Sequence, residues 1–386
     1  MIKISDFRSK ISYLYLFSLS SKWSVTIVVS LLQFLLIPLY LKYLGKETFG
    51  VITLIQTARQ IADVGVGWMI GGALRMLSEM EAKKDSHGFN TIYSAVKISY
   101  TCIGLFLIIL IWVVLPLFIR DLSADFDLIF SLIIASINTI LIYSFSADRA
   151  AFGAKKWQFK SDIAYILSQI VTALFSIIFL VRGFGLKEII TSQLFGTISM
   201  MLVGFLFWKN SNVDIEFIYS LKDIKRILKK LFRKSSGYFI FGNINTAINY
   251  LDIFLLGYLS NSVTVAEYYL LWKIPQFCIL FIQQIPYSYT PFFMSLDLSE
   301  DINQLKRNYQ KGFKYITYLS AFCAIQYALF GKQFMLLWVG DSAPEENYIY
   351  LLIALTLFIL IISKWPIQLS FSLVNMRVLN KIIFLE

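Results

Sequence analysis

LYLKYLGKETFGVITLIQTARQIADVGVGWMIGG, residues Leu39–Gly72, lies in one of the most apolar regions of the chain and still carries two full charges, Arg59 and Asp63. In a helix these residues lie four positions apart on one face, where they can form an ion pair. A charge at the centre of a membrane helix costs roughly 2.5–3.5 kcal/mol. The two charges therefore predict either a structural ion pair within one helix or a polar cavity, and we favour the cavity.

The chain has more apolar residues than a protein surrounded only by water can bury, which indicates that part of its surface contacts lipid. Of the 386 residues, 58% are hydrophobic and 15% are charged, and the mean hydropathy is +0.68. Soluble domains are about 45–50% apolar and about 25% charged. The chain is therefore predicted to be a multi-pass membrane protein. Its net charge of +11 is ascribed to loops at the membrane surface, so no nucleic-acid partner is expected.

Histidine and cysteine, which form many metal-binding and nucleophilic catalytic sites, are scarce in this chain. The single histidine, His87, lies in the charged loop EAKKDSHG, and Cys102, Cys278 and Cys323 lie in apolar segments. A histidine metal site, a Ser-His-Asp hydrolase and a disulfide scaffold are therefore not expected. The chain has no phosphate-binding loop of the form GxxxxGK[ST], so we expect neither ATP hydrolysis nor a cofactor.

A membrane-spanning helix needs about 20 mostly apolar residues, and this requirement sets the fold class as all-α integral membrane. Ten stretches meet the requirement: 22–43, 48–72, 92–119, 128–148, 160–181, 187–208, 236–259, 264–290, 313–337 and 347–374. The apolar stretch near the N-terminus is too long for a secretion signal and lacks a small-residue cleavage site, so we expect an uncleaved first span.

The charges of the connecting loops alternate along the chain. Loops on one side, together with both ends of the chain, carry 26 Lys and Arg residues, Lys97 among them, whereas the loops on the other side carry six. Cytoplasmic loops of membrane proteins are enriched in Lys and Arg. The asymmetry therefore predicts that both termini are cytoplasmic.

The sixth connecting segment, KNSNVDIEFIYSLKDIKRILKKLFRKSSG, divides the chain. It holds eight basic residues, with six predicted spans before it and four after it. We predict an N-terminal six-helix bundle in 1–210, a basic cytoplasmic connector in 211–235 and a C-terminal four-helix bundle in 236–386. The amphipathic part of the connector, DIKRILKKLF, is expected to lie on the anionic leaflet. Two halves joined in this way are typical of the internal repeats of secondary transporters.

Further charged residues lie within or near the predicted spans. Lys273 and Lys364 each stand beside a tryptophan and close to a proline. The proline can open polar backbone towards a cavity, and snorkelling to an interface is the alternative. Asp148 and Arg149 approach the cytoplasmic end of a span, where an interfacial position explains them equally well. The predicted cavity residues are Arg59, Asp63, Asp148, Arg149, Asp252, Lys273 and Lys364.

Three patches of the sequence carry short motifs. The first, IPLYLKYLGKETFGVITLIQTARQIADVGVG, has a proline-bearing first helix, a YLG-x-E-x-[FY]-G turn, and an aspartate closely followed by glycine, at Pro38, Tyr43, Leu44, Gly45, Glu47, Phe49, Gly50, Asp63 and Gly65. The second, LFGKQFMLLWVGDSAPEENYIYLLIALTLF, carries a G-x-x-[FI]…W-x-G pattern at Gly331, Phe334, Trp338 and Gly340. The third is NYLDIFLLGYLS with Asp252. Together these patches resemble polysaccharide-export flippases of the Wzx type, in which the second patch is similar to a later outer turn and the third to the start of the family's second half.

The resemblance implies two helical bundles related by a pseudo-twofold axis, around a cavity that opens alternately to each face. It implies a cargo of polyprenyl-diphosphate-linked oligosaccharide, such as an O-antigen repeat unit, moved to the periplasmic leaflet of a bacterial inner membrane. Family members usually carry at least twelve spans, so the second bundle is expected to be two spans short. Membrane lipids and other polysaccharide-assembly proteins are further expected partners.

A cavity that holds three cations would attract an anionic cargo, and a carboxylate beside a cation can exchange protons. We expect Arg59, Lys273 and Lys364 to contact the cargo phosphates. Asp63 and Asp252 are expected to be their partners or to carry protons, with coupling to H+ or Na+.

Three other interpretations remain open. A multidrug or cation antiporter of the same architecture would favour an acidic cavity, and the three internal cations count against it. A membrane polysaccharide polymerase or glycosyltransferase would need a larger catalytic loop than the short outer loops provide, so an enzyme is not expected. The third interpretation is a non-transporting scaffold.

Overall fold

A computed structural model describes residues 4–62, 64–114, 126–211, 217, 223–231, 251–286 and 302–373. Within these ranges the regular secondary structure is helical, with no strand. The helices group into two compact units, Met1–Ser262 and Val263–Glu386. The domain limits expected from the sequence, 1–210, 211–235 and 236–386, stay predictions.

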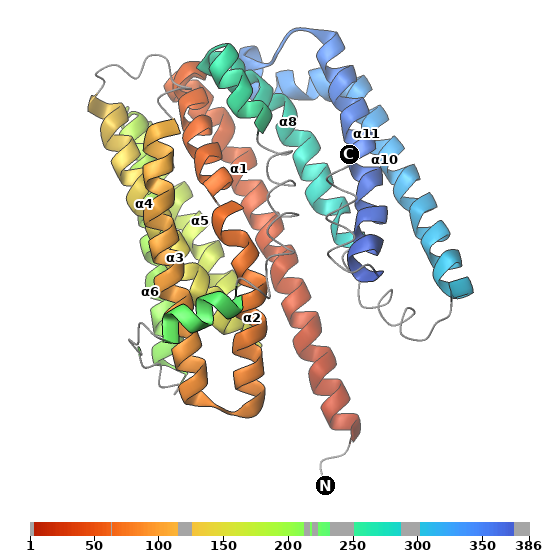
Figure 1. The fold of residues 1–386 in the computed structure, drawn as a ribbon. Coiled ribbons are helices and arrows are strands. Elements are labelled where there is room, and N and C mark those ends of the chain that lie inside the picture. The colour runs from red at the N-terminus through yellow and green to blue at the C-terminus, as the bar shows by residue number, and fades with distance from the viewer. Residues whose placement is uncertain are drawn as a thin grey trace. The chain divides into compact units, whose positions relative to one another are not determined.

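The first unit is built from long helices joined mostly by short turns (Figure 1). They are α1 (Ile4–Ala62), α2 (Val64–Lys83), α3 (Ser86–Val114), α4 (Phe126–Ala154), α5 (Gln158–Val181) and α6 (Leu186–Lys209), with helical segments at 223–231 and 251–259. The second unit is also helical. Its elements are α8 (Ser262–Ile282), which begins at the boundary, α10 (Ile302–Val339), the 3-10 turn η2 (Gly340–Ser342) and α11 (Asn347–Leu373).

Eight stretches of the described chain are long and apolar enough to cross a membrane. They are Ser20–Gln60, Ser86–Ile109, Phe126–Ala154, Gln158–Val181, Leu186–Lys209, Ser262–Pro286, Lys306–Ser342 and Asn347–Leu369. The prediction of an all-α, multi-pass membrane protein is therefore confirmed. The expected seventh span, 236–259, lies mostly outside the described residues, so the expected total of ten is not matched one to one.

The first of these stretches contains a reversal of the chain at Gly45. As one helix its 41 residues would extend about 60 Å, twice the thickness of a bilayer core. Gly45 has φ 78° and ψ 170°, which interrupts the helix. The rings of Tyr40 and Phe49 stack across the break with centroids 6.3 Å apart, whereas nine residues of unbroken helix would separate them by about 13 Å. α1 thus turns back on itself (Figure 1), with the break at Gly45. It supplies the first expected span and residues 48–62 of the second, whose last residues belong to α2.

The core of the first unit lies where α2, α3 and α4 meet. Small residues of α4, such as Ala147 and Ala151, let large side chains of α2 and α3 approach closely, among them Met76 and Tyr93. These four side chains are almost completely buried. In a membrane such close packing replaces the hydrophobic effect as the main source of helix association.

The second unit contains a hairpin of α10 and α11 joined through η2. Ser320 Oγ on α10 donates to the carbonyl of Phe358 on α11 at 2.7 Å. Trp365 Nε1 donates to the carbonyl of Tyr309 at 3.1 Å. α8 is held to α10 by Tyr327, whose hydroxyl donates to the carbonyl of Leu271 at 2.6 Å. These side-chain bonds to carbonyls fix the register of the helices.

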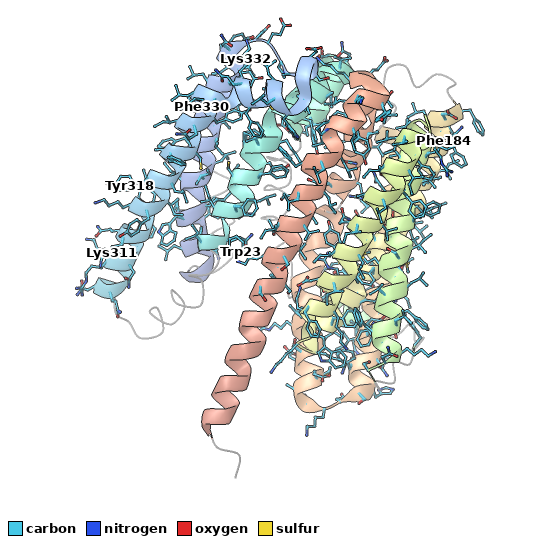
Figure 2. The ribbon with its side chains drawn as sticks, turned by 180° about the vertical axis from the view of Figure 1, so that it is seen from behind. Trp23, Phe184, Lys311, Tyr318, Phe330 and Lys332 are labelled. Atoms are coloured by element: carbon cyan, nitrogen blue, oxygen red, sulfur yellow. The ribbon has the colours of Figure 1, made fainter. Side chains whose placement is uncertain are left out.

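The outer surface of α10 shows the pattern of a lipid-facing helix. Figure 2 shows Lys311 and Lys332 towards opposite ends of α10, with Tyr318 and Phe330 between them. Tyr318 and Phe330 are 61% and 57% exposed. Long basic side chains at the ends and exposed apolar side chains between them suit a hydrocarbon layer bounded by two polar interfaces.

The structure explains why several positions of the quoted motifs are glycine. A Cβ on Gly50 would overlap the backbone of Ser262, so only glycine permits this close approach. Gly340 has φ +59° and begins the turn between α10 and α11. Both positions, like Gly45, are glycine because the path of the backbone requires it.

Candidate functional site

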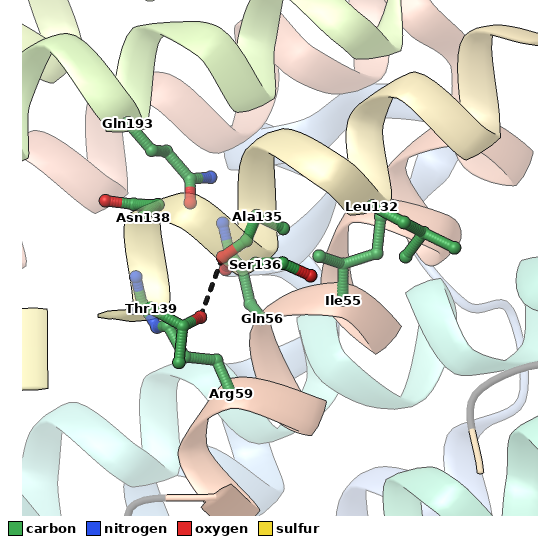
Figure 3. Close-up of a pocket in the computed structure, with 9 residues that line it drawn as sticks. All are labelled: Ile55, Gln56, Arg59, Leu132, Ala135, Ser136, Asn138, Thr139 and Gln193. Atoms are coloured by element: carbon green, nitrogen blue, oxygen red, sulfur yellow. Dashed lines mark hydrogen bonds between the residues drawn. The ribbon is translucent and has the colours of Figure 1, made fainter. Parts of the chain in front are cut away.

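A small pocket with several polar side chains in its lining lies between α1, α4 and α6 in the first unit. It has a cavity volume of about 20 Å³, enough for about one water molecule, and is lined by Ile55, Gln56, Arg59, Leu132, Ala135, Ser136, Asn138, Thr139 and Gln193. Figure 3 shows Arg59 and Gln56 coming from α1, Asn138 from α4 and Gln193 from α6, around the same space. A cation and three amides thus share one pocket inside a membrane-spanning bundle.

The electrostatics of this pocket are set by Arg59. No acidic side chain in the described part of the chain forms an ion pair with its guanidinium, and Asp63, its expected partner, lies outside that part. The carbonyl of Arg59 accepts a long hydrogen bond of 3.5 Å from the Tyr143 hydroxyl. Thr139 Oγ1 uses its proton within α4, donating to the Ala135 carbonyl at 2.7 Å (Figure 3).

Asn138 brings an unsatisfied acceptor to the lining of the pocket. It is only 2% exposed, and its Oδ1 has no hydrogen-bond partner among the described residues. An unpaired buried amide oxygen is costly, so the site gains free energy when a donor reaches it. The pocket offers guanidinium and amide donors to an anion and amide acceptors to hydroxyl groups.

Asp148 lies in a different place, within a fully bonded cluster. Its Oδ2 accepts from Lys97 Nζ at 3.0 Å, and its Oδ1 accepts from the Tyr93 hydroxyl at 2.6 Å and from Trp208 Nε1 at 2.9 Å. Lys97 also donates to the Tyr93 oxygen at 3.0 Å. Asp148 follows Asn138 by ten residues of α4, about 15 Å along the helix. The cluster joins α3, α4 and α6.

The other predicted residues occupy separate positions in the two units. Arg149 is exposed. Asp252 is half-buried, and its Oδ1 accepts from the backbone N–H of Ile253 at 2.8 Å. Within the second unit, Lys364 is half-buried on α11. The role of each in transport stays a prediction.

Lys273 on α8 is buried in aromatic surroundings. It is 4% exposed, and its Nζ donates to the Tyr269 hydroxyl at 2.9 Å and to Gln276 Oε1 at 3.1 Å. The same atom lies 4.9 Å from the Tyr269 ring centroid and 5.4 Å from that of Phe277. Aromatic faces and neutral oxygens stabilise the ammonium group without neutralising it.

The prediction that Lys97 is a loop charge on the basic side is wrong. Lys97 lies within α3 and pairs with Asp148. A signal was present, because Lys97 falls inside the expected span 92–119, four residues after Tyr93. That spacing puts the two side chains on one helical face.

The fold is that of transporters in the MATE and MurJ structures. A multidrug resistance MATE family transporter of the MOP superfamily, inward-facing, aligns with a TM-score of 0.67 at 14% identity, covering 92% of this chain and 84% of that one. The lipid II flippase MurJ, in an inward closed conformation, aligns with a TM-score of 0.70 at 14% identity, covering 95% and 78%. The Vibrio cholerae MATE transporter VcmN, in its bent form, gives 0.60 at 14% identity, covering 97% and 87%.

The family follows from the sequence itself. The model of the polysaccharide biosynthesis protein family matches residues 42–342, and the chain belongs to this family. A comparison with curated proteins finds no match. The expected relationship to polysaccharide-export proteins is therefore confirmed at the level of the family and the fold.

Proposed function

We propose that the protein is a Wzx-type flippase. It moves a polyprenyl-diphosphate-linked oligosaccharide, an O-antigen or related repeat unit, from the cytoplasmic to the periplasmic leaflet of a bacterial inner membrane. It works by alternating access without hydrolysing ATP and without catalysing a reaction on the cargo. Both termini face the cytoplasm, and H+ or Na+ supplies the driving force.

Arg59 is the observation that carries this proposal. Its guanidinium lines a pocket within the membrane-spanning bundle and has no carboxylate partner in the described chain. A cation in a low-dielectric site is costly to desolvate, and each ligand that pairs with it lowers that cost. A diphosphate would offset that cost through bidentate, charge-assisted hydrogen bonds. The family match and the fold shared with the flippase MurJ support the same conclusion.

The test is export by variants of Arg59 in a strain that lacks its own flippase. Arg59→Ala should lower surface polysaccharide at least tenfold and leave lipid-linked repeat units in the cytoplasmic leaflet, while Arg59→Lys should retain part of the activity. Arg182→Ala is the matched control, because Arg182 is an exposed arginine at the end of α5. Normal export by Arg59→Ala, with the protein present at wild-type amounts, would contradict the assignment.

A cation antiporter is the second candidate, supported by the fold shared with MATE transporters. An antiporter of this kind would need a carboxylate free to bind a cationic drug. In the first unit Asp148 is buried but already receives three donors, including the ammonium of Lys97. We therefore expect no gain of drug resistance on expression of the protein, and resistance lost on Asp148→Asn would favour the antiporter instead.

A further inference from the structure

The helical segment 223–231 has two distinct faces. Ile227 and Leu231 are 6% and 1% exposed, and both belong to the core cluster of the first unit. Ile224 and Leu228 are partly buried against the same cluster. The apolar face of this helix is therefore occupied by protein, although the sequence favoured a helix laid on lipid.

The opposite face is strongly basic. Lys225, Arg226, Lys229 and Lys230 are all exposed, and their spacing puts them on one side of the helix. Arg226 pairs with Asp223 at 2.9 Å. The three lysines form no ion pair with any acidic side chain of the described chain, so this face keeps most of its positive charge.

The position of the helix is that of a membrane interface. Its buried residues Ile227 and Leu231 belong to the same core cluster as Phe89 in the first turn of α3 and Ala154 in the last turn of α4, and Met80 near the end of α2 packs against that cluster. Trp157 and Lys160 lie close to this end of the bundle, with the Lys160 ammonium 3.8 Å from the Trp157 ring centroid. Tryptophan and lysine together are typical of the headgroup region of a bilayer.

We propose that the basic face of helix 223–231 is a docking surface for anionic phospholipid headgroups of the adjacent leaflet. Because the apolar face is already buried in the bundle, the helix does not insert into the acyl chains. Binding rests on charge alone, so it depends on headgroup charge and weakens with salt over the Debye length. The proposal is independent of the cargo.

The experiment titrates the purified full-length protein with phosphatidylglycerol and, separately, with zwitterionic phosphatidylcholine. The test variant carries Lys225→Gln, Lys229→Gln and Lys230→Gln, and the matched control carries arginine at the same three positions. Affinity for phosphatidylglycerol should fall at least tenfold in the glutamine variant, on the order of what three juxtamembrane charges contribute. It should stay near the wild-type value in the arginine variant.

A second measurement needs no variant. For the wild-type protein, the affinity for phosphatidylglycerol should decrease with increasing salt, and phosphatidylcholine should bind weakly at any salt. Equal affinity for the two lipids, or an unchanged affinity in a folded glutamine variant, would overturn the proposal. Binding of poly-glutamate in preference to phosphatidylglycerol would also overturn it, and would point to an acidic protein as the partner.

Discussion

Lys97 and Asp148, 51 residues apart in the sequence, meet as an ion pair of 3.0 Å between Nζ and Oδ2 inside the first unit. The side chain of Lys97 is 23% exposed and that of Asp148 is 8% exposed. Tyr93 and Trp208 complete the coordination of the carboxylate. A carboxylate with this many donors is held in one position. The cluster around Asp148 therefore fixes α3, α4 and α6 to one another.

Removing one member of this pair should be worse than removing both. Asp148→Leu leaves the Lys97 ammonium in the bundle without a counter-charge and should lower the free energy of unfolding by about 3 kcal/mol. The double variant Lys97→Met/Asp148→Leu should recover a large part of that loss. Thermal unfolding in detergent measures both. Equal losses in the single and double variants would show that the ion pair contributes little.

The reversal at Gly45 should not tolerate a side chain. A Cβ at Gly45 has no heavy atom within 4 Å, so Gly45→Ala tests backbone strain alone, at about 1–3 kcal/mol. Gly185→Ala is the matched control, because Gly185 is also open but has φ −103°. The measurement is unfolding of the two variants side by side. Comparable stability would mean that the turn adopts another conformation.

Gly312 should be equally restrictive for a different reason. A Cβ there would overlap the ring of Trp365, which is 1% exposed and cannot move without losing its packing. Gly312→Ala should destabilise the α10–α11 hairpin by about 1–3 kcal/mol. The added loss should be smaller when Trp365 is already leucine, which a double-mutant cycle measures. Additive effects would contradict direct contact.

Much of the fold follows from hydropathy, because lipid forces helices to be long and continuous in their apolar character. The reversal at Gly45 was also readable, since a glycine separates two apolar stretches that are each long enough to span. Hydropathy could not decide whether the apolar face of an amphipathic helix contacts lipid or protein. The segment at 223–231 has the same pattern whether its apolar face meets lipid or protein, and only tertiary contacts decide.

The candidate site was predicted in part. Arg59 was singled out because a charge in an apolar stretch requires a polar environment, and the pocket between α1, α4 and α6 supplies one. Gln56, Asn138 and Gln193 were not predicted. Burying an uncharged amide in a membrane costs less free energy than burying a charge, so amides do not mark a cavity as clearly. Lys97 was missed for another reason, because a lysine near a span end looks the same whether it reaches the interface or a buried carboxylate.

Lys273 offers a test that separates stability from transport. Its ammonium is buried and bonded to Tyr269 and Gln276, with no acidic partner in the described chain. Lys273→Met removes a desolvated charge, so the free energy of unfolding should stay the same or rise by about 1 kcal/mol. Export should nevertheless fall at least tenfold if the charge serves the cargo, and Lys273→Arg should restore it. A Lys273→Met protein that exports normally, or that loses export only in proportion to lost folding, would make Lys273 a structural residue.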